Sequence, residues 1–311
     1  MGNLPTVCAA SVTPVDIVGA ADTQKLSAHC HWLLNNGCDG VVLFGTTGEA
    51  ASFGIEERRS VLEEIIASGI DSARLIVGTG CCSVEDTMLL SRHALATGCA
   101  GILIHPPFFF RPATDEGSLA FFTELVESLG ADARDIVLYH FPDATGAPIN
   151  SAVIEQLMDR YPSVFVGIKD STGNLDNMIE LSRQFPDLKV YTGDDHLLWP
   201  LLEAGGYGAI TATANLMPNL LAQVRVDWHE KRSNVHSAHA TLSQLWEEVL
   251  LKFPISEAVK EVVASVSGDN GWRDLRPPLS PLPVPLRVQL AQMVAPFADR
   301  FPLGLGERDA K

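Results

Sequence analysis

The sequence predicts an α/β fold, a (β/α)8 TIM barrel with a C-terminal helical extension. Eight short apolar runs recur along the 311 residues, and the segments between them carry apolar residues at helical spacing, as in Ile55–Ile66 and Val153–Met158. Strands that are apolar throughout are typical of a parallel sheet covered by helices. Eight β–α units in about 225 residues give about 28 residues per unit, the size expected for such a barrel.

The predicted strands follow one another along the chain, and a helical pattern follows each of them. They are Val7–Thr13, Gly40–Phe44, Arg74–Val77, Ala100–Ile104, Asp135–Tyr139, Val164–Lys169, Leu188–Tyr191 and Gly206–Thr211. A doubly wound sheet is the alternative, but no glycine-rich dinucleotide fingerprint follows the first strand. We therefore expect residues 1–225 to form a barrel that carries the active site.

The remainder of the chain, residues 226–311, is predicted to be a helical region packed on the barrel. It contains the proline-rich stretch Pro277–Pro285, which by itself would also suit a polyproline ligand for a partner. Because Leu286–Val294 is again apolar at helical spacing, we expect the stretch to connect two C-terminal helices.

The composition is that of a globular protein and limits the classes of partner. Hydrophobic residues make up 46% of the chain and charged residues 19%. The formal net charge is −16 and Lys and Arg do not cluster, so we expect no binding to nucleic acid or to an anionic membrane. No apolar run approaches the roughly 20 residues that cross a bilayer. The six cysteines include no C-x-x-C pair, which indicates reduced thiols in a cytoplasmic protein.

Lys169 is the first candidate for catalysis, because reactive groups in such barrels lie at the C-terminal ends of the strands. Alternation puts Phe165, Gly167 and Lys169 on one face of the sixth strand. If that face is the interior, the lysine points into the barrel beside a glycine that leaves it room. Burying an ammonium ion is costly, which favours a neutral amine that can form a Schiff base with a carbonyl. A surface lysine, or one paired with Asp170, is the alternative.

Two other strand ends carry groups that could assist this chemistry. Tyr139 shares parity with Val137, so its phenol can point into the same interior and shuttle protons. An aromatic core residue is the simpler interpretation of Tyr139 alone. The segment Gly45-Thr46-Thr47-Gly48-Glu49 precedes a helix, where backbone N–H groups and two hydroxyls suit an anion such as a carboxylate. A tight turn with a helix cap is the alternative there.

These segments together carry a resemblance to a known family. The motifs that carry it are, in chain order, Gly45-Thr46-Thr47-Gly48-Glu49, Tyr139-His140-Phe141-Pro142, Gly167-Ile168-Lys169-Asp170-Ser171-Thr172-Gly173 and Gly193-Asp194-Asp195. With them the chain resembles the dihydrodipicolinate synthase / N-acetylneuraminate lyase family of class I aldolases. The resemblance covers essentially the whole chain, including Lys252-Phe253-Pro254-Ile255. It is much more specific for the superfamily than for one substrate.

The resemblance implies a role for each matching residue. Lys169 would form an imine with pyruvate or another 2-oxo acid, Tyr139 would relay protons, and Thr46 and Thr47 would bind the substrate carboxylate, with Thr46 joining the relay. Further substrate-binding candidates are Gly45, Gly193 and Ile210 at the pyruvate end and Asp143, Asp195 and His196 toward the aldehyde. The resemblance implies no cofactor, no metal and a homotetramer built as a dimer of dimers. Asp195 could instead cap the next helix.

The sequence departs from the synthases at several matching positions. Ala144 stands where the synthases carry an arginine that grips the carboxylate of the second substrate, which disfavours true dihydrodipicolinate synthesis. Phe109 stands where a neighbouring subunit donates a tyrosine to the proton relay, and a phenyl ring cannot carry protons. Feedback inhibition by lysine is not expected, because the matching positions lack the polar set of lysine-sensitive members; they are Ile55, Arg58, Cys82 and Phe108.

The predicted function is a lyase that reversibly cleaves a 2-oxo-3-deoxy (sugar) acid to pyruvate and an aldehyde through a Lys169 imine. A 2-keto-3-deoxy sugar acid dehydratase is the nearest alternative, because the same imine can drive loss of a β-hydroxyl. A metal-dependent aldolase that uses Asp194, Asp195 and His196 is less favoured, since three consecutive residues converge poorly on one ion. A non-catalytic 2-oxo acid-binding homologue is the non-enzymatic alternative.

Overall fold

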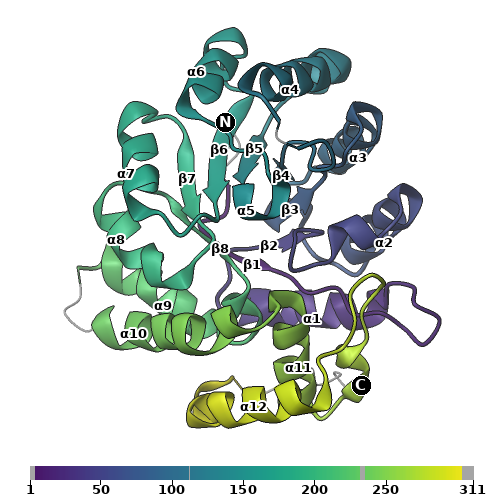
Figure 1. Cartoon of the computed structure of the whole chain (residues 1–311), viewed down its shortest axis with the longest axis vertical. Coiled ribbons are helices and arrows are strands. Elements are labelled where there is room, and N and C mark those ends of the chain that lie inside the picture. The colour runs from purple at the N-terminus through teal and green to yellow at the C-terminus, as the bar shows by residue number, and fades with distance from the viewer. Residues whose placement is uncertain (1–3, 112, 232–234, 303–311) are drawn as a thin grey trace. The chain divides into compact units, whose positions relative to one another are not determined.

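The computed structural model describes residues 4–111, 113–231 and 235–302. Eight strands are hydrogen-bonded in chain order and form a closed barrel, which confirms the predicted fold class (Figure 1). Each strand overlaps the apolar run that predicted it. The strands are β1 (Val7–Ala10), β2 (Gly40–Leu43), β3 (Leu75–Gly78), β4 (Gly101–Ile104), β5 (Ile136–His140), β6 (Phe165–Asp170), β7 (Lys189–Thr192) and β8 (Gly208–Thr211).

Helices alternate with the strands and continue after β8. They are α1 (Thr23–Asn35), α2 (Ile55–Ala67), α3 (Val84–Ala96), α4 (Asp115–Leu129), α5 (Pro142–Thr145), α6 (Ser151–Arg160), α7 (Leu175–Gln184), α8 (Leu198–Glu203), α9 (Pro218–His229), α10 (Val235–Gln244), α11 (Ile255–Ser267) and α12 (Val284–Val294). Several begin at a capping side chain, since Ser83, Thr114 and Asn174 accept a hydrogen bond from a backbone N–H of the first turn. The proline-rich stretch lies between α11 and α12.

The chain divides into two compact units, each described by itself. The first is Met1–Thr6 with Ser72–Ile210, and it contains β3 to β7, nearly all of β8, and α3 to α8. Within it, α3 packs against α4 and α4 against α6. The second is Val7–Asp71 with Thr211–Lys311, where α1 packs against α2, α9 against α10, and α11 against α12. The predicted division at residue 225 stays a prediction.

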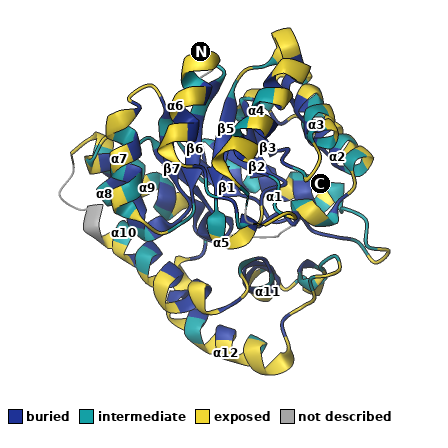
Figure 2. Ribbon diagram, turned by 45° about the horizontal axis from the view of Figure 1, so that its top comes forward, coloured by how far each residue is buried: buried dark blue, intermediate teal, exposed yellow. Residues whose placement is uncertain are grey.

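Burial follows the pattern expected of strands covered by helices. Every residue of β1 to β5 and of β8 is buried, so these strands have no solvent-facing side. The helices instead combine buried and exposed faces (Figure 2). Within the described ranges, no helix has both the length and the apolar character that spanning a membrane requires.

Candidate active site

The first unit brings two of the predicted catalytic residues together at adjacent strand ends. In the parallel ladder between β5 and β6, Tyr139 is in register with Lys169. Residues in register on neighbouring strands point to the same face of a sheet. The Nζ atom of Lys169 lies 4.6 Å from the centroid of the Tyr139 ring. Lys169 is 6% exposed and Tyr139 is 4% exposed, so the amine and the phenol belong to one buried cluster.

Asp170 follows Lys169 directly, but its carboxylate is engaged by other groups. One oxygen accepts hydrogen bonds from the backbone N and Oγ1 of Thr172 at 2.8 and 2.6 Å, and the other accepts from Asn177 Nδ2 at 2.7 Å. The carboxylate therefore fixes the turn between β6 and α7. Within the described ranges, no carboxylate forms an ion pair with Lys169. Lys169 is therefore neither a surface lysine nor a partner of Asp170.

Gly167 has a different structural reason from the one expected. A Cβ atom at this position would lie 2.9 Å from the carbonyl oxygen of Lys189 on β7. The glycine therefore allows β7 to approach β6 closely. Glycine is therefore needed at position 167 because of the Lys189 backbone, and not to make room for the Lys169 side chain.

Aromatic rings surround the Tyr139 side. The Phe141 ring stacks on the Tyr139 ring with centroids 5.9 Å apart, and the His105 ring lies 6.5 Å from it. His105 directly follows β4, and a Cβ atom at Gly80 would lie 2.9 Å from its Nε2 atom, so a glycine makes room for the imidazole. His105 was not among the residues that the sequence predicted for the site. The rule that selected Lys169, a polar residue at a strand end, would also have found it.

His140 faces away from Tyr139 and supports the loop that follows β5. Its Nδ1 atom accepts a hydrogen bond from the backbone N–H of Ile149 at 3.0 Å, so the proton of the neutral ring is on Nε2. Burial lowers the pKa of His140, and the charge of Asp170 opposes that shift. The imidazole thus fixes the connection between α5 and α6, which follows the position of the synthase arginine on α5.

The predicted aldehyde end of the site includes an arginine from another segment. Asp143 and Ala144 are exposed on α5. The Nη2 atom of Arg111 donates to the carbonyl oxygen of Ala144 at 2.7 Å, and its Nε atom donates to Phe108 O at 2.7 Å. A guanidinium group therefore lies beside position 144, although residue 144 itself is alanine. Phe109 is 74% exposed.

The remaining candidates of the first unit lie at the ends of β7 and β8. The backbone N–H of Gly193 donates to Asp170 O at 2.7 Å, and a Cβ atom there would displace the Ser171 side chain. Asp195 and Ile210 are fully buried, and His196 is half-buried. In the part of the chain that the structure describes, no group of three or more His, Cys, Asp or Glu residues could hold a metal ion.

Thr46 and Thr47 lie in the second unit, in the loop Gly45–Glu49 that follows β2. Thr46 is exposed and Thr47 is buried. The loop is closely packed, because a Cβ atom at Gly48 would lie 2.7 Å from Ser11 O. Thr13 Oγ1 donates to the carbonyl oxygen of Gly48 at 2.8 Å. The two threonines therefore stand on a loop that packs against Ser11 and Thr13, which follow β1.

Comparison with known proteins places the chain in a family. The model of the dihydrodipicolinate synthetase family matches residues 3–295. The chain belongs to this family. It is 36% identical over 277 residues to a DapA-like lyase of Chloroflexus aurantiacus, covering 89% of this chain and 91% of the relative. Members of the dihydrodipicolinate synthetase family are lyases, and this chain is therefore a lyase.

Solved structures agree with the family assignment. Dihydrodipicolinate synthase from Agrobacterium tumefaciens has a TM-score of 0.86 at 33% identity and covers 94% of this chain and 98% of its own. YagE, a prophage protein of the same family from E. coli, was solved in complex with pyruvate. It has a TM-score of 0.84 at 26% identity, with coverage of 94% and 98%.

Proposed function

We propose that this lyase reversibly cleaves a 2-oxo-3-deoxy (sugar) acid to pyruvate and an aldehyde through an imine on Lys169. The observation that supports this most directly is the buried Lys169 amine 4.6 Å from the Tyr139 ring, beside an Asp170 carboxylate that other donors occupy. No carboxylate in the described ranges forms an ion pair with this amine, so its nitrogen is not committed to a salt bridge and can serve as the nucleophile that adds to a carbonyl.

The proposed reaction begins when the Lys169 amine adds to the C2 carbonyl of the substrate. The resulting carbinolamine loses water, and the Tyr139 hydroxyl carries a proton between nitrogen and oxygen. The C3–C4 bond then breaks, the C4 hydroxyl loses its proton to become the aldehyde, and the bonding electrons remain on C3 as an enamine. Protonation at C3 and hydrolysis of the imine release pyruvate and restore the amine. Thr46 and Thr47 hold the substrate carboxylate in this proposal.

Reductive trapping tests the proposal. Incubation with pyruvate and borohydride should attach a reduced three-carbon unit to the peptide that contains Lys169. The peptide with Lys189 is the internal control, since this lysine is only half-buried on the neighbouring strand β7. An unmodified Lys169 peptide at high pyruvate concentration would contradict the proposed function.

The structure also favours a synthase as a second candidate. Arg111 places a guanidinium beside Ala144, and such a group can bind a carboxylate of a second substrate through two hydrogen bonds. Product analysis separates the proposed cleavage from the dehydratase alternative. A 2-keto-3-deoxy sugar acid should give pyruvate and an aldehyde under our proposal, whereas a dehydratase would release water and keep the carbon skeleton. Assembly as a homotetramer and a cytoplasmic location stay predictions.

A further inference from the structure

The loop that carries Thr46 and Thr47 is bordered by two residues in a strained backbone conformation. Phe44 has a φ of 55° and Glu49 a φ of 58°, both in the left-handed region. For residues other than glycine this conformation costs on the order of 1–3 kcal/mol and persists only where the surroundings impose it. The contacts of these two residues therefore decide the shape of the loop between them.

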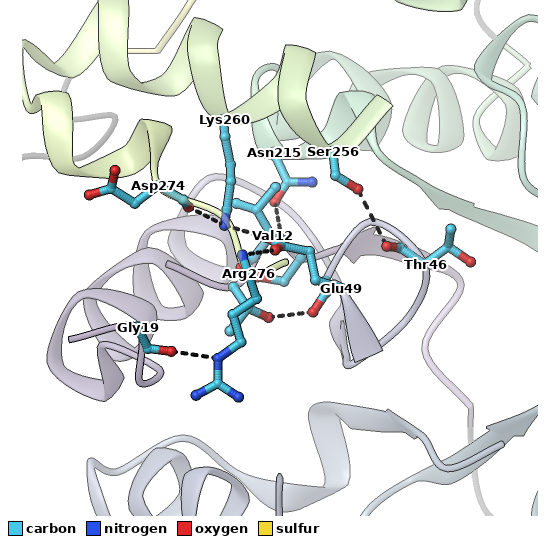
Figure 3. A network of polar contacts seen from close by, with 12 residues as sticks. Val12, Gly19, Thr46, Glu49, Asn215, Ser256, Lys260, Asp274 and Arg276 are labelled. Carbon is cyan, nitrogen blue, oxygen red and sulfur yellow. Dashed lines mark hydrogen bonds and ion pairs between the residues drawn. The ribbon is translucent and has the colours of Figure 1, made fainter. Parts of the chain in front are cut away.

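The Glu49 side chain is held by a fully buried ion pair. Lys260 Nζ on α11 donates to Glu49 Oε1, and both side chains have no exposed surface (Figure 3). Lys260 also donates to Asp274 O at 2.8 Å, and the backbone N–H of Arg276 donates to Glu49 Oε2 at 3.1 Å. Burial lowers the pKa of Lys260, and the charge of Glu49 opposes this. Both carboxylate oxygens thus have a donor.

Helix α11 also reaches the other end of the loop. Ser256 lies four residues before Lys260, so both side chains belong to one face of the helix. Its Oγ atom donates to Thr46 O at 3.4 Å (Figure 3). One helical face therefore contacts the loop at Thr46 and at Glu49, on both sides of Thr47.

Arg276 links Glu49 to the residues that follow the loop. Its guanidinium donates to both carboxylate oxygens of Glu57 at 2.7 Å and to Ser52 O at 3.1 Å. Glu57 lies in the first turn of α2, which follows the loop. The Arg276 backbone and side chain thus connect Glu49 to the start of α2.

We propose that Lys260, acting through Glu49, is a positioning residue for the carboxylate subsite that Thr46 and Thr47 form. This inference rests on the proposed function, because it assigns the threonines to the substrate carboxylate. Hydrogen-bond donors of a binding site work when they are held within about 0.5 Å of the productive geometry. The ion pair provides that precision by fixing the left-handed Glu49 at the end of the threonine segment.

The double variant Glu49→Gln/Lys260→Met tests the inference without leaving an unpaired buried charge. We expect its half-saturating pyruvate concentration in reductive trapping to rise about tenfold or more, with the trapping rate at saturation within about threefold of wild type. Ser256→Ala, which removes one weak contact, should produce a smaller rise in the same direction. That single variant keeps the test available if the double variant does not fold.

Glu261→Gln is the matched control. Glu261 is the neighbour of Lys260 on α11 and pairs with Arg273, not with the loop. This variant should lose stability while its pyruvate dependence stays that of wild type. A folded double variant with wild-type pyruvate dependence would overturn the inference, and so would an equal change in Glu261→Gln.

Hydrogen exchange separates this inference from the proposed function. In the absence of pyruvate, the backbone amides of residues 45–50 should exchange faster in the double variant than in wild type. Their exchange rates in Glu261→Gln should equal those of wild type. If wild type is not labelled by pyruvate, the proposed function fails. If wild type is labelled but loop exchange is unchanged in the double variant, the positioning role fails.

Discussion

Lys169 and Lys260 are two buried lysines with opposite surroundings. Lys260 has no exposed side-chain surface and forms an ion pair with Glu49, while Lys169 lies over the Tyr139 ring next to a carboxylate that Thr172 and Asn177 occupy. A buried carboxylate partner keeps an ammonium ion charged and in place. Burial therefore does not by itself decide what a lysine does. Lys260 is held in an ion pair, whereas no ion pair in the described ranges engages Lys169, the nucleophile that we propose.

The largest effect is expected from replacing Lys169. Lys169→Met removes the proposed nucleophile, so turnover should fall by at least about 10,000-fold and borohydride labelling by pyruvate should disappear. Steady-state pyruvate release and peptide mass spectrometry provide the measurement. The folding stability of this variant should stay near that of wild type, because Lys169 has no ion-pair partner in the described ranges to abandon.

Replacing Lys260 should instead have its main effect on the stability of the fold. Lys260→Met leaves Glu49 buried without its counter-charge, so the free energy of unfolding should fall by about 3–5 kcal/mol. Urea denaturation measures this, and Glu49→Gln/Lys260→Met should regain most of the loss. Equal destabilisation by Lys169→Met would erase the distinction between the two lysines.

The hydroxyl of Tyr139 is expected to contribute less than the lysine but much more than packing. Tyr139→Phe keeps the ring beside Lys169 and removes the proposed proton carrier, so the rate should fall by about 100- to 1,000-fold. Single-turnover trapping isolates imine formation. Wild-type trapping rates in this variant would mean that another group carries the proton.

A third buried basic group, His29, should affect stability through pH. Its Nε2 atom lies 3.0 Å from Asn215 Oδ1, and Asn215 Nδ2 donates to the backbone carbonyls of Ala10 and Ala212. The same Oδ1 atom also accepts a hydrogen bond from Val12 N (Figure 3). Asn215 therefore presents an acceptor, and His29 is neutral with its proton on Nε2. Burial lowers the pKa of His29 from 6.5 to about 4.

The sign of the His29 effect follows from this lowered pKa. The unfolded chain takes up the proton first, so this contribution is fully present above about pH 6.5 and is lost as the pH falls toward 4, by about 3 kcal/mol in total. His29→Gln retains a donor for Asn215 and cannot titrate there. Denaturation of both proteins from pH 7 to 4 should show a smaller acid loss in the variant, and parallel curves would contradict the assignment.

Local sequence patterns predicted the barrel, but they did not predict contacts between residues that are far apart in the sequence. The apolar runs located all eight strands, and strand alternation was enough to orient Lys169 and Tyr139 together. Glu49 and Lys260 are 211 residues apart, and His29 and Asn215 are 186 apart. Periodicity describes only neighbours, so His29 on its helix reads as an ordinary surface or packing residue, and Glu49 reads as the end of a turn. The roles of Thr46, Thr47 and the aldehyde-end residues stay predictions.

The sequence separation of the Glu49–Lys260 pair has a consequence for protein synthesis. At about 5–20 residues per second, the ribosome adds Lys260 roughly 10–40 seconds after Glu49. Until then the nascent chain holds a carboxylate that can only be solvated by water. A polypeptide stopped before α11 would lack both Ser256 and Lys260, so the loop that carries Thr46 and Thr47 acquires its final shape only after α11 has been synthesised.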